Sequence, residues 1–477
     1  MFNCVVFSNN NNFYLFDGVS GNILSIDEDK VEGIKNFFTL ESSQRTMLNT
    51  SVIDSEIKQA IENNFIKPVP QKEVVYWFNE EEYFKTLFEE MSHLMIGVTE
   101  NCNMRCKYCV YGGHYPNERT HKEVSIKKEK IIKIIDRFYE LSKNKQKVIN
   151  FYGGEPFLCF SEIKEATNYL KKYNDNVQIY ITTNGTLLSD EVCRWFSENL
   201  NVHIYVSIAG IPKWHDQLRV FINGNPTFET IHKNLIKLKS CDPVAYAERV
   251  HFVFNIFDEK QLFELQDFWS NHEIFKTIKI LPEITFIDCV DDDGMINEMG
   301  EKISKNYKNE ASPLSEYIRL LQIGELDNLI VKHYDNKFLG IHRRTSDETP
   351  IISGVCRPFV KKLFVDTKGN LHLCENFSYG NKFKSIFNEF PILELKELLN
   401  LYKNFKQDNC SKCWASKLCS LCFRDLIDRD GTVNLARSKK ICINEKESLK
   451  KLLKEYCTVL ENSPTLLDHL DDYIIYV

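Results

Sequence analysis

The cysteines of this 477-residue chain are the residues whose type and spacing most plainly indicate chemistry. Three of the sixteen lie between Cys102 and Cys109 and seven between Cys356 and Cys442, while the other six are scattered. Grouped thiolates bind metal ions or iron–sulfur clusters, whereas disulfide frameworks belong mostly to small secreted domains. The first residues show no basic segment followed by a sustained apolar stretch, so we expect no secretory signal. We therefore predict metal sites in a soluble, cytoplasmic protein.

The first group has the spacing Cys102-x3-Cys106-x2-Cys109. A cubane [4Fe–4S] cluster normally takes four thiolates, so three cysteines in one loop would leave one iron open to an exogenous ligand. A structural zinc site is the alternative, and it usually needs a fourth Cys or His, for which His114 is a candidate. The loop alone leaves both interpretations open.

The same loop resembles the signature of the radical S-adenosylmethionine (SAM) superfamily, with aromatic Tyr108 before the last cysteine. Two further segments are similar to motifs of that family, FYGGEP at 151–156 and TTNGTL at 182–187. The resemblance implies that the open iron chelates SAM, whose reductive cleavage yields a 5′-deoxyadenosyl radical. It assigns cofactor contacts to Tyr108, Gly153, Gly154, Glu155, Asn184, Ser207 and Arg219.

A second feature of this region is the run His215-Asp216-x2-Arg219, which resembles an HD-x2-R run of peptide-modifying members. An arginine suits a carboxylate ligand because it can bind both oxygens, although a surface ion pair is the alternative for Arg219. Ala209 departs from the family, which often has Asp there.

The second cysteine group resembles the SPASM/twitch domain, which carries two auxiliary [4Fe–4S] clusters. Its C-x2-C pairs are equally typical of zinc modules, and the x2 spacing before Cys422 departs from the usual x3. Glu375 occupies the position of a catalytic acidic residue in anaerobic sulfatase-maturing relatives, or it is an exposed glutamate on a turn. The resemblance implies a distal group, Cys410, Cys413, Cys419 and Cys442, and a nearer group, Cys356, Cys374 and Cys422.

Strand-like and helical segments alternate after residue 93, which predicts parallel βαβ units and an α/β fold with a partial (β/α)6 TIM-like barrel. The clearest helix is Ser125–Leu141. Ligands of such folds bind at the carboxyl ends of the strands, where the motifs above lie. The six expected strands are Leu94–Thr99, Val148–Tyr152, Val177–Thr182, Val202–Ile208, Val250–Ile256 and Thr277–Leu281.

We expect four regions along the chain. Residues 1–90, with three strand-like runs and short helices, form a small winged-helix-like unit for peptide recognition. Residues 91–300 form the barrel, 301–354 a connecting segment, and 355–477 the SPASM domain. The stretch 286–352 looks irregular, and few long periodic segments are expected in the last region before Asn444, after which a helix begins.

Composition excludes some partners. The formal net charge of −7 gives no basic footprint for nucleic acid, and no apolar run reaches the roughly 18 residues of a membrane span. The leading hypothesis is an enzyme that modifies a ribosomally made precursor peptide bearing a leader, by cysteine thioether cross-linking. A flavodoxin or ferredoxin would supply electrons. The alternatives are a sulfatase-type maturase that forms formylglycine and a non-catalytic zinc-binding interaction protein.

Overall fold

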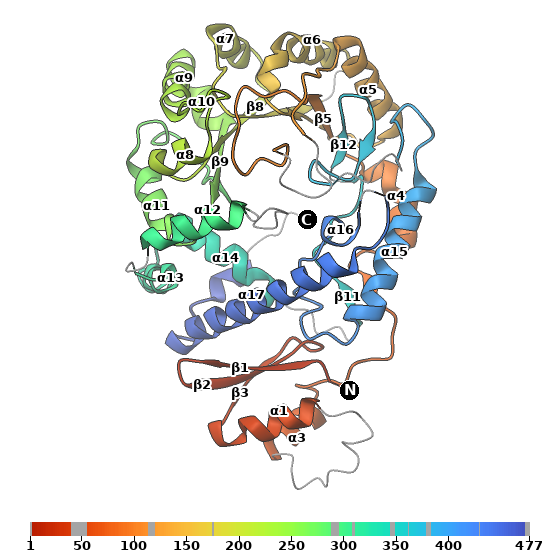
Figure 1. The fold of residues 1–477 in the computed structure, drawn as a ribbon, viewed down its shortest axis with the longest axis vertical. Helices are drawn as coiled ribbons and strands as arrows, with labels where there is room; N and C mark the ends of the chain where they lie inside the picture. The colour runs from red at the N-terminus through yellow and green to blue at the C-terminus, as the bar shows by residue number, and fades with distance from the viewer. Residues whose placement is uncertain are drawn as a thin grey trace.

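The computed structural model describes residues 2–39, 55–112, 120–173, 176–287, 295–307, 311–343, 349–360, 362–377, 383–428 and 430–472. An arc of strands and helices fills the upper part of Figure 1. The long helix α17 (Leu435–Asn462) crosses beneath this arc, and a small separate sheet lies below that helix. No described helix is long and apolar enough to cross a membrane.

The main sheet has the strand order β10-β9-β8-β7-β6-β5-β12-β13. Neighbouring strands from β10 to β12 are parallel, and only the hairpin of β12 and β13 is antiparallel among the described pairs of this sheet. The predicted α/β fold with a mostly parallel sheet is therefore confirmed. The strands are β5 (His93–Thr99), β6 (Val148–Gly153), β7 (Gln178–Thr183), β8 (Val202–Ile208), β9 (Val250–Ile256), β10 (Glu283–Phe286), β12 (Leu363–Val365) and β13 (Leu371–His372).

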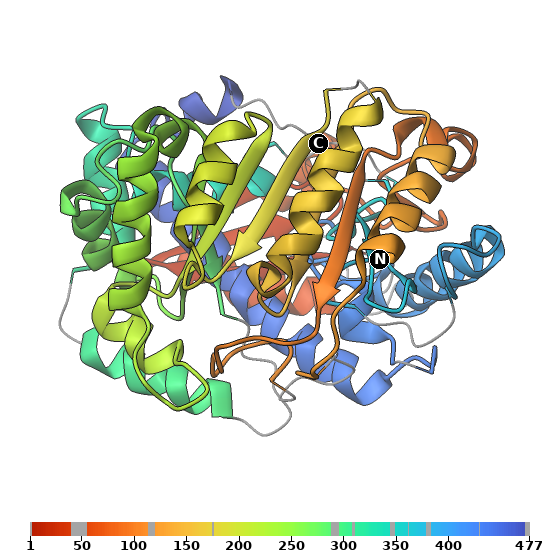
Figure 2. The ribbon, with the colours of Figure 1, turned by 90° about the horizontal axis from the view of Figure 1, so that it is seen from above.

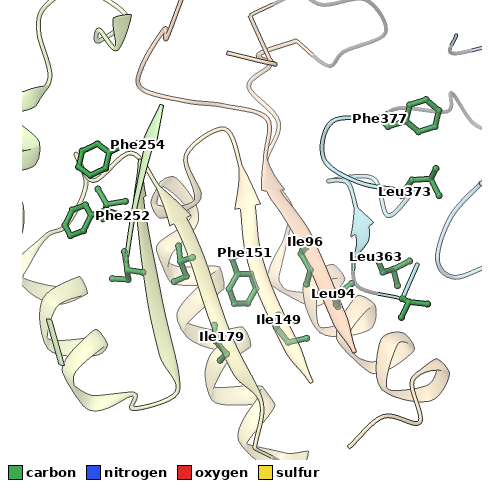
Figure 3. Packing of buried hydrophobic residues seen from close by; sticks show 14 of the residues in the cluster. Leu94, Ile96, Ile149, Phe151, Ile179, Phe252, Phe254, Leu363, Leu373 and Phe377 are labelled. Carbon is green, nitrogen blue, oxygen red and sulfur yellow. The ribbon is translucent and has the colours of Figure 1, made fainter. Parts of the chain in front are cut away.

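Helices cover one side of this sheet, as Figure 2 shows from above. Apolar side chains alternate along the strands, so one face of each strand packs against the helices. Leu94, Ile96, Ile149 and Ile179, labelled in Figure 3, belong to one core with residues of the first covering helix. The helices are α5 (Lys128–Leu141), α6 (Phe160–Leu170), α7 (Asp190–Glu198), α8 (Pro212–Leu218), α9 (Phe228–Cys241), α10 (Pro243–Arg249) and α11 (Gln261–Asn271).

Two predicted elements of the barrel are corrected. The sixth strand is β10, and the predicted run Thr277–Leu281 lies before it in a turn and loop. Pro282 has no N–H to pair, and the ladder with β9 starts at the next residue. The clearest helix begins at Lys128 rather than Ser125, because the backbone N–H of Ile126 bonds instead to Val98 of β5.

The amino-terminal unit is an antiparallel sheet of β1 (Cys4–Asn9), β2 (Asn12–Asp17) and β3 (Ile23–Ile26). It packs with α1 (Val31–Thr39) and α3 (Ser55–Glu62) around a small core of its own that includes Leu15 and Ile57. The linker to the barrel contains β4 (Val75–Tyr76), which pairs with β11 (Ile351–Ile352), and helix α4 (Glu80–Glu90).

The carboxyl-terminal half is more helical than the sequence indicated. The stretch expected to be irregular contains α12 (Met295–Ser304), α13 (Pro313–Gln322) and α14 (Leu329–His342). The cysteine-rich region contains the long helix α15 (Ile392–Cys410) and the short α16 (Phe423–Leu426), and α17 begins at Leu435, well before Asn444. Strand β12 of the cysteine-rich region pairs with β5 and extends the barrel sheet, so the cysteine-rich region and the barrel share one sheet.

Candidate active site

A cavity of about 550 Å³ lies at the carboxyl ends of the barrel strands. Its walls come from two parts of the chain that are far apart in sequence, the barrel and the cysteine-rich region. The first part supplies Cys102, Cys106, Tyr108, Cys109, Gly153, Gly154, Asn184, Ser207 and Arg219, and the second supplies Glu375, Asn376 and Arg424. The structure thus brings together nearly all of the residues that the family resemblance assigns to the cluster and to SAM.

The first cysteine loop directly follows β5 and places its three thiols along one wall. Backbone N–H groups of Met104 and Tyr111 lie 3.4 Å from the sulfurs of Cys102 and Cys109, respectively. Burial raises the pKa of both thiols to about 12, so their thiolate forms require a nearby positive charge such as bound iron. His114, the candidate fourth zinc ligand, lies outside the described residues, as do Cys289 and the acidic run Asp291–Asp293.

The two glycines at the end of β6 let that strand end lie against the cysteine loop. A Cβ on Gly154 would lie 2.0 Å from the carbonyl oxygen of Asn101, and one on Gly153 would lie 2.3 Å from that of Thr99. Gly153 also has φ of +140°, which side-chain-bearing residues rarely adopt. Both glycines line the cavity, but the close neighbour that excludes a side chain is the loop itself.

Glu155 is fully buried behind this wall and is not among the cavity-lining residues. Its carboxylate accepts hydrogen bonds from the Thr183 hydroxyl at 2.7 Å and from the backbone N–H of Asn184 at 2.8 Å. Burial raises the pKa of Glu155 above its ordinary value, although these hydrogen bonds oppose that effect. Glu155 therefore fixes the end of β7, and Asn184 in turn lies 3.8 Å from the sulfur of Cys102.

Arg219 is buried and points one Nη1–H group at the hydroxyl of Tyr108, 2.8 Å away. Its buried Nε–H has no hydrogen-bond partner among the described residues. A buried donor without a partner costs free energy, and a ligand carboxylate in the cavity would satisfy it. This arrangement fits a cavity built for the carboxylate of an amino-acid cofactor such as SAM.

The His215–Asp216 pair positions Arg219 and does not line the cavity. Nδ1 of His215 accepts the backbone N–H of Ala209, and its Nε2–H donates to Thr227, whose hydroxyl bonds to the carbonyl of Arg219. Burial lowers the pKa of His215 well below its usual range, which keeps the ring neutral and this tautomer in place. The side chain of Asp216 accepts the backbone N–H groups of Thr227 and Phe228 at the start of α9.

Glu375 reaches the cavity from the cysteine-rich region and receives the ammonium of Lys362 at 2.8 Å. Glu375 directly follows Cys374, so a negative charge on its carboxylate would act on the thiols of the nearer cysteine group. The ammonium offsets that charge. The sequence motifs gave no signal for Lys362, Asn376 or Arg424, because no local pattern marks them.

The cysteines of the second group also lie near one another. Burial raises the pKa of Cys374 to about 12 and of Cys422 to about 11; the two thiols interact with each other, and Cys422 also interacts with Cys356. In the distal group, burial and then the neighbouring thiols of Cys413, Cys419 and Cys442 raise the pKa of Cys410 to about 11. The donor chemistry fits clusters at both groups.

Within the described ranges, no three His, Cys, Asp or Glu side chains gather as the ligands of a single metal ion would. A cubane attaches each thiolate to a different iron, so its protein ligands surround the cluster instead of converging on one point.

Comparisons with known proteins agree with this geometry. Residues 96–253 match the family described as the radical SAM superfamily. A cysteine-type anaerobic sulfatase-maturating enzyme of Clostridium novyi is 26% identical over 346 residues, which cover 69% of this chain and 87% of that protein. An uncharacterised protein of Methanocaldococcus jannaschii is 34% identical over 156 residues, which cover 32% of this chain and about half (51%) of that relative's length. A solved structure of anSMEcpe with bound AdoMet has a TM-score of 0.53 at 18% identity, covering 80% of this chain and 96% of that one, and so shares the fold.

Proposed function

Residues 96–253 form the radical SAM domain of an enzyme, and from this premise we propose that the enzyme modifies a ribosomally made precursor peptide, by cysteine thioether cross-linking. One observation carries the proposal. Glu375 and Asn376 of the cysteine-rich region face the same cavity as Arg219 and the first cysteine loop. A substrate between them would contact both the cofactor side and the auxiliary side at once.

The roles of the residues follow from their positions. Cys102, Cys106 and Cys109 would hold a [4Fe–4S] cluster, and Arg219 would hold the carboxylate of SAM. The cluster and SAM, when bound, supply reductive cleavage and hydrogen-atom abstraction, and auxiliary clusters at the second cysteine group supply an electron acceptor. Protein side chains bind, orient and exclude water around these groups.

Thioether formation removes one hydrogen from a thiol and one from a carbon. One leaves as a hydrogen atom and the other as a proton and an electron. Glu375 is the carboxylate placed in the cavity to accept the proton, and the Lys362 ammonium 2.8 Å away holds it in position. We propose Glu375 as the catalytic base on this ground.

The amino-terminal unit would bind the leader of the peptide. Among the described strands, β3 pairs only with β2, so its other edge offers unpaired backbone groups to an added strand. A flavodoxin or ferredoxin would return electrons to the clusters.

The first experiment supplies the anaerobically reconstituted enzyme with SAM, a reductant and any short Cys-rich peptide that a neighbouring gene encodes. We expect 5′-deoxyadenosine and a peptide that is two hydrogens lighter and no longer alkylated at one cysteine. An enzyme that carries only zinc, or a peptide of unchanged mass beside ample 5′-deoxyadenosine, would contradict the proposal.

Formylglycine formation is the second candidate, and the likeness to the Clostridium novyi sulfatase-maturating enzyme over most of that protein's length favours it. It also removes two hydrogens before hydrolysis of the thioaldehyde. The final products can be distinguished by reactivity, since only formylglycine reacts with an aldehyde trap such as an aminooxy reagent.

A further inference from the structure

Lys406 is a lysine inside the cysteine-rich region. It lies on α15, four residues before Cys410, and only 3% of its surface is exposed. Among the described residues no carboxylate lies within ion-pair distance of its ammonium, and an aromatic ring, that of Tyr402, is centred 5.4 Å away. An ammonium is rarely buried unless an anion compensates the lost hydration.

The groups that face the ammonium of Lys406 are thiols of the distal group, which would be thiolates when they bind a cluster. The Nζ of Lys406 donates to the sulfur of Cys419 at 3.8 Å. Cys410 lies one helical turn further along the same face of α15. Both cysteines belong to the distal group, so the positive charge of Lys406 is directed at that group.

The nearer group differs in this respect. Its lysine, Lys362, is paired with the carboxylate of Glu375 at 2.8 Å, so the two charges largely offset each other beside Cys374. Lys406 has no such carboxylate within the described part of the chain. The ammonium of Lys406 is therefore not paired with a described carboxylate, although the carboxylate of Glu445, which accepts hydrogen bonds from Ser420, also acts on Cys419.

We infer that Lys406 is a positioning residue that raises the reduction potential of the distal cluster, through its N–H···S contact with Cys419 and its buried positive charge. The inference rests on the auxiliary clusters of the proposed function. Net charge and hydrogen bonds to the sulfurs are the means by which proteins set the potential of such clusters, and a cation favours the reduced, more negative state. A higher potential at the distal cluster favours the transfer of an electron to it from the nearer cluster.

The test uses the full chain with Cys102, Cys106 and Cys109 all changed to Ala, which leaves only the auxiliary clusters. Iron is counted, and the midpoint potentials are measured by dye-mediated titration followed by electron paramagnetic resonance. About eight irons and two potentials are expected. Lys406→Met should lower one potential so that its reduced-to-oxidised ratio, at the original midpoint, falls about tenfold, which is about 59 mV for one electron. The other potential should not move.

Lys403→Met is the matched control, because Lys403 lies on the same helix but pairs with Glu80 at 3.3 Å and should leave both potentials unchanged. Lys406→Gln separates the two contributions, since it can still donate an N–H group to sulfur but carries no charge. Eight irons with both potentials unchanged in Lys406→Met would overturn the inference and leave the proposed function intact. Fewer than eight irons in the parent would instead overturn the auxiliary clusters themselves. Loss of four irons from both Lys406 variants, with Lys403→Met fully loaded, would also overturn it in favour of a role in cluster assembly.

Discussion

The two cysteine groups are organised in opposite ways. The first occupies eight consecutive residues in one loop, and its position follows from the end of a single strand, β5. The second collects Cys356 and Cys374 from either side of the β12–β13 hairpin and the other five cysteines from α15, α17 and the residues between these helices, so its geometry depends on how those elements pack. A site built on one strand end can be recognised from its motif, whereas a site assembled by packing can be recognised only once the chain has folded.

The largest expected effect is a loss of SAM cleavage when the first cysteine group is changed but not when the second is. Cys106→Ala removes a ligand of the first group and should abolish the reductive cleavage of SAM, because no other described side chain replaces it. Cys442→Ala removes a distal ligand on α17 and should leave cleavage within about threefold of the parent, since the barrel cavity does not include it. Chromatography of 5′-deoxyadenosine measures both. Equal loss in the two variants would contradict the independence of the groups.

Two glycine variants test the same difference between the first and the second cysteine group. Gly154→Ala places a Cβ 2.0 Å from the carbonyl of Asn101 and should displace the first loop, lowering SAM cleavage about a hundredfold. Gly354→Ala places one 2.7 Å from the carbonyl of Cys419, at φ of +75°, and should cost irons of the second group while sparing SAM cleavage. Iron analysis beside the cleavage assay distinguishes them. Iron lost from the same group in both variants would contradict this expectation.

Arg219→Met should weaken SAM binding by about 10- to 150-fold, since it removes a charged hydrogen bond of about 1.5–3 kcal/mol. Isothermal titration of the reconstituted protein measures the dissociation constant. Arg137→Met is the control, because Arg137 lies on α5 outside the cavity and bonds to Glu140. Unchanged affinity in Arg219→Met would remove this residue from the cofactor site.

The smallest effect concerns the hairpin of β12 and β13 that leads to Cys374. Burial alone would raise the pKa of Asp366, but hydrogen bonds from His372 and Asn370 lower it to about 2. The folded pKa lies below the unfolded one, so this carboxylate stabilises the fold above pH 4 and loses that contribution as the pH falls towards 2. Asp366→Asn should cost about 2 kcal/mol at pH 7 and roughly half of that at pH 3. Urea unfolding of the metal-free chain at both pH values measures it; a constant difference would contradict this assignment.

The sequence predicted the barrel well because strand periodicity and strand-end motifs are local. Five of the six strands were placed within a residue or two, and the residues predicted to bind the cluster and SAM line one cavity apart from Glu155. The cofactor contact of Glu155 stays a prediction, and the structure adds the hydrogen bonds that its carboxylate accepts from Thr183 and Asn184 behind the wall. The partners of Lys362 and Lys406 could not be predicted from the sequence either. Their side chains become buried and paired only when the fold brings distant segments together.

The close approach between the amino-terminal unit and the distal cysteines limits which segments of the chain can be exchanged with those of a related protein. A Cβ on Gly18 would lie 2.2 Å from the carbonyl of Trp414, which stands between Cys413 and Cys419, and Phe16 meets the Trp414 ring edge-on. On the same face of this strand, Tyr14 bonds to Glu461 on α17, the helix that carries Cys442. A chimaera that takes the amino-terminal unit from a relative would therefore have to inherit the loop of Cys410–Cys419 with it. The amino-terminal unit and this loop would have to be exchanged together, although about 400 residues separate them in the chain.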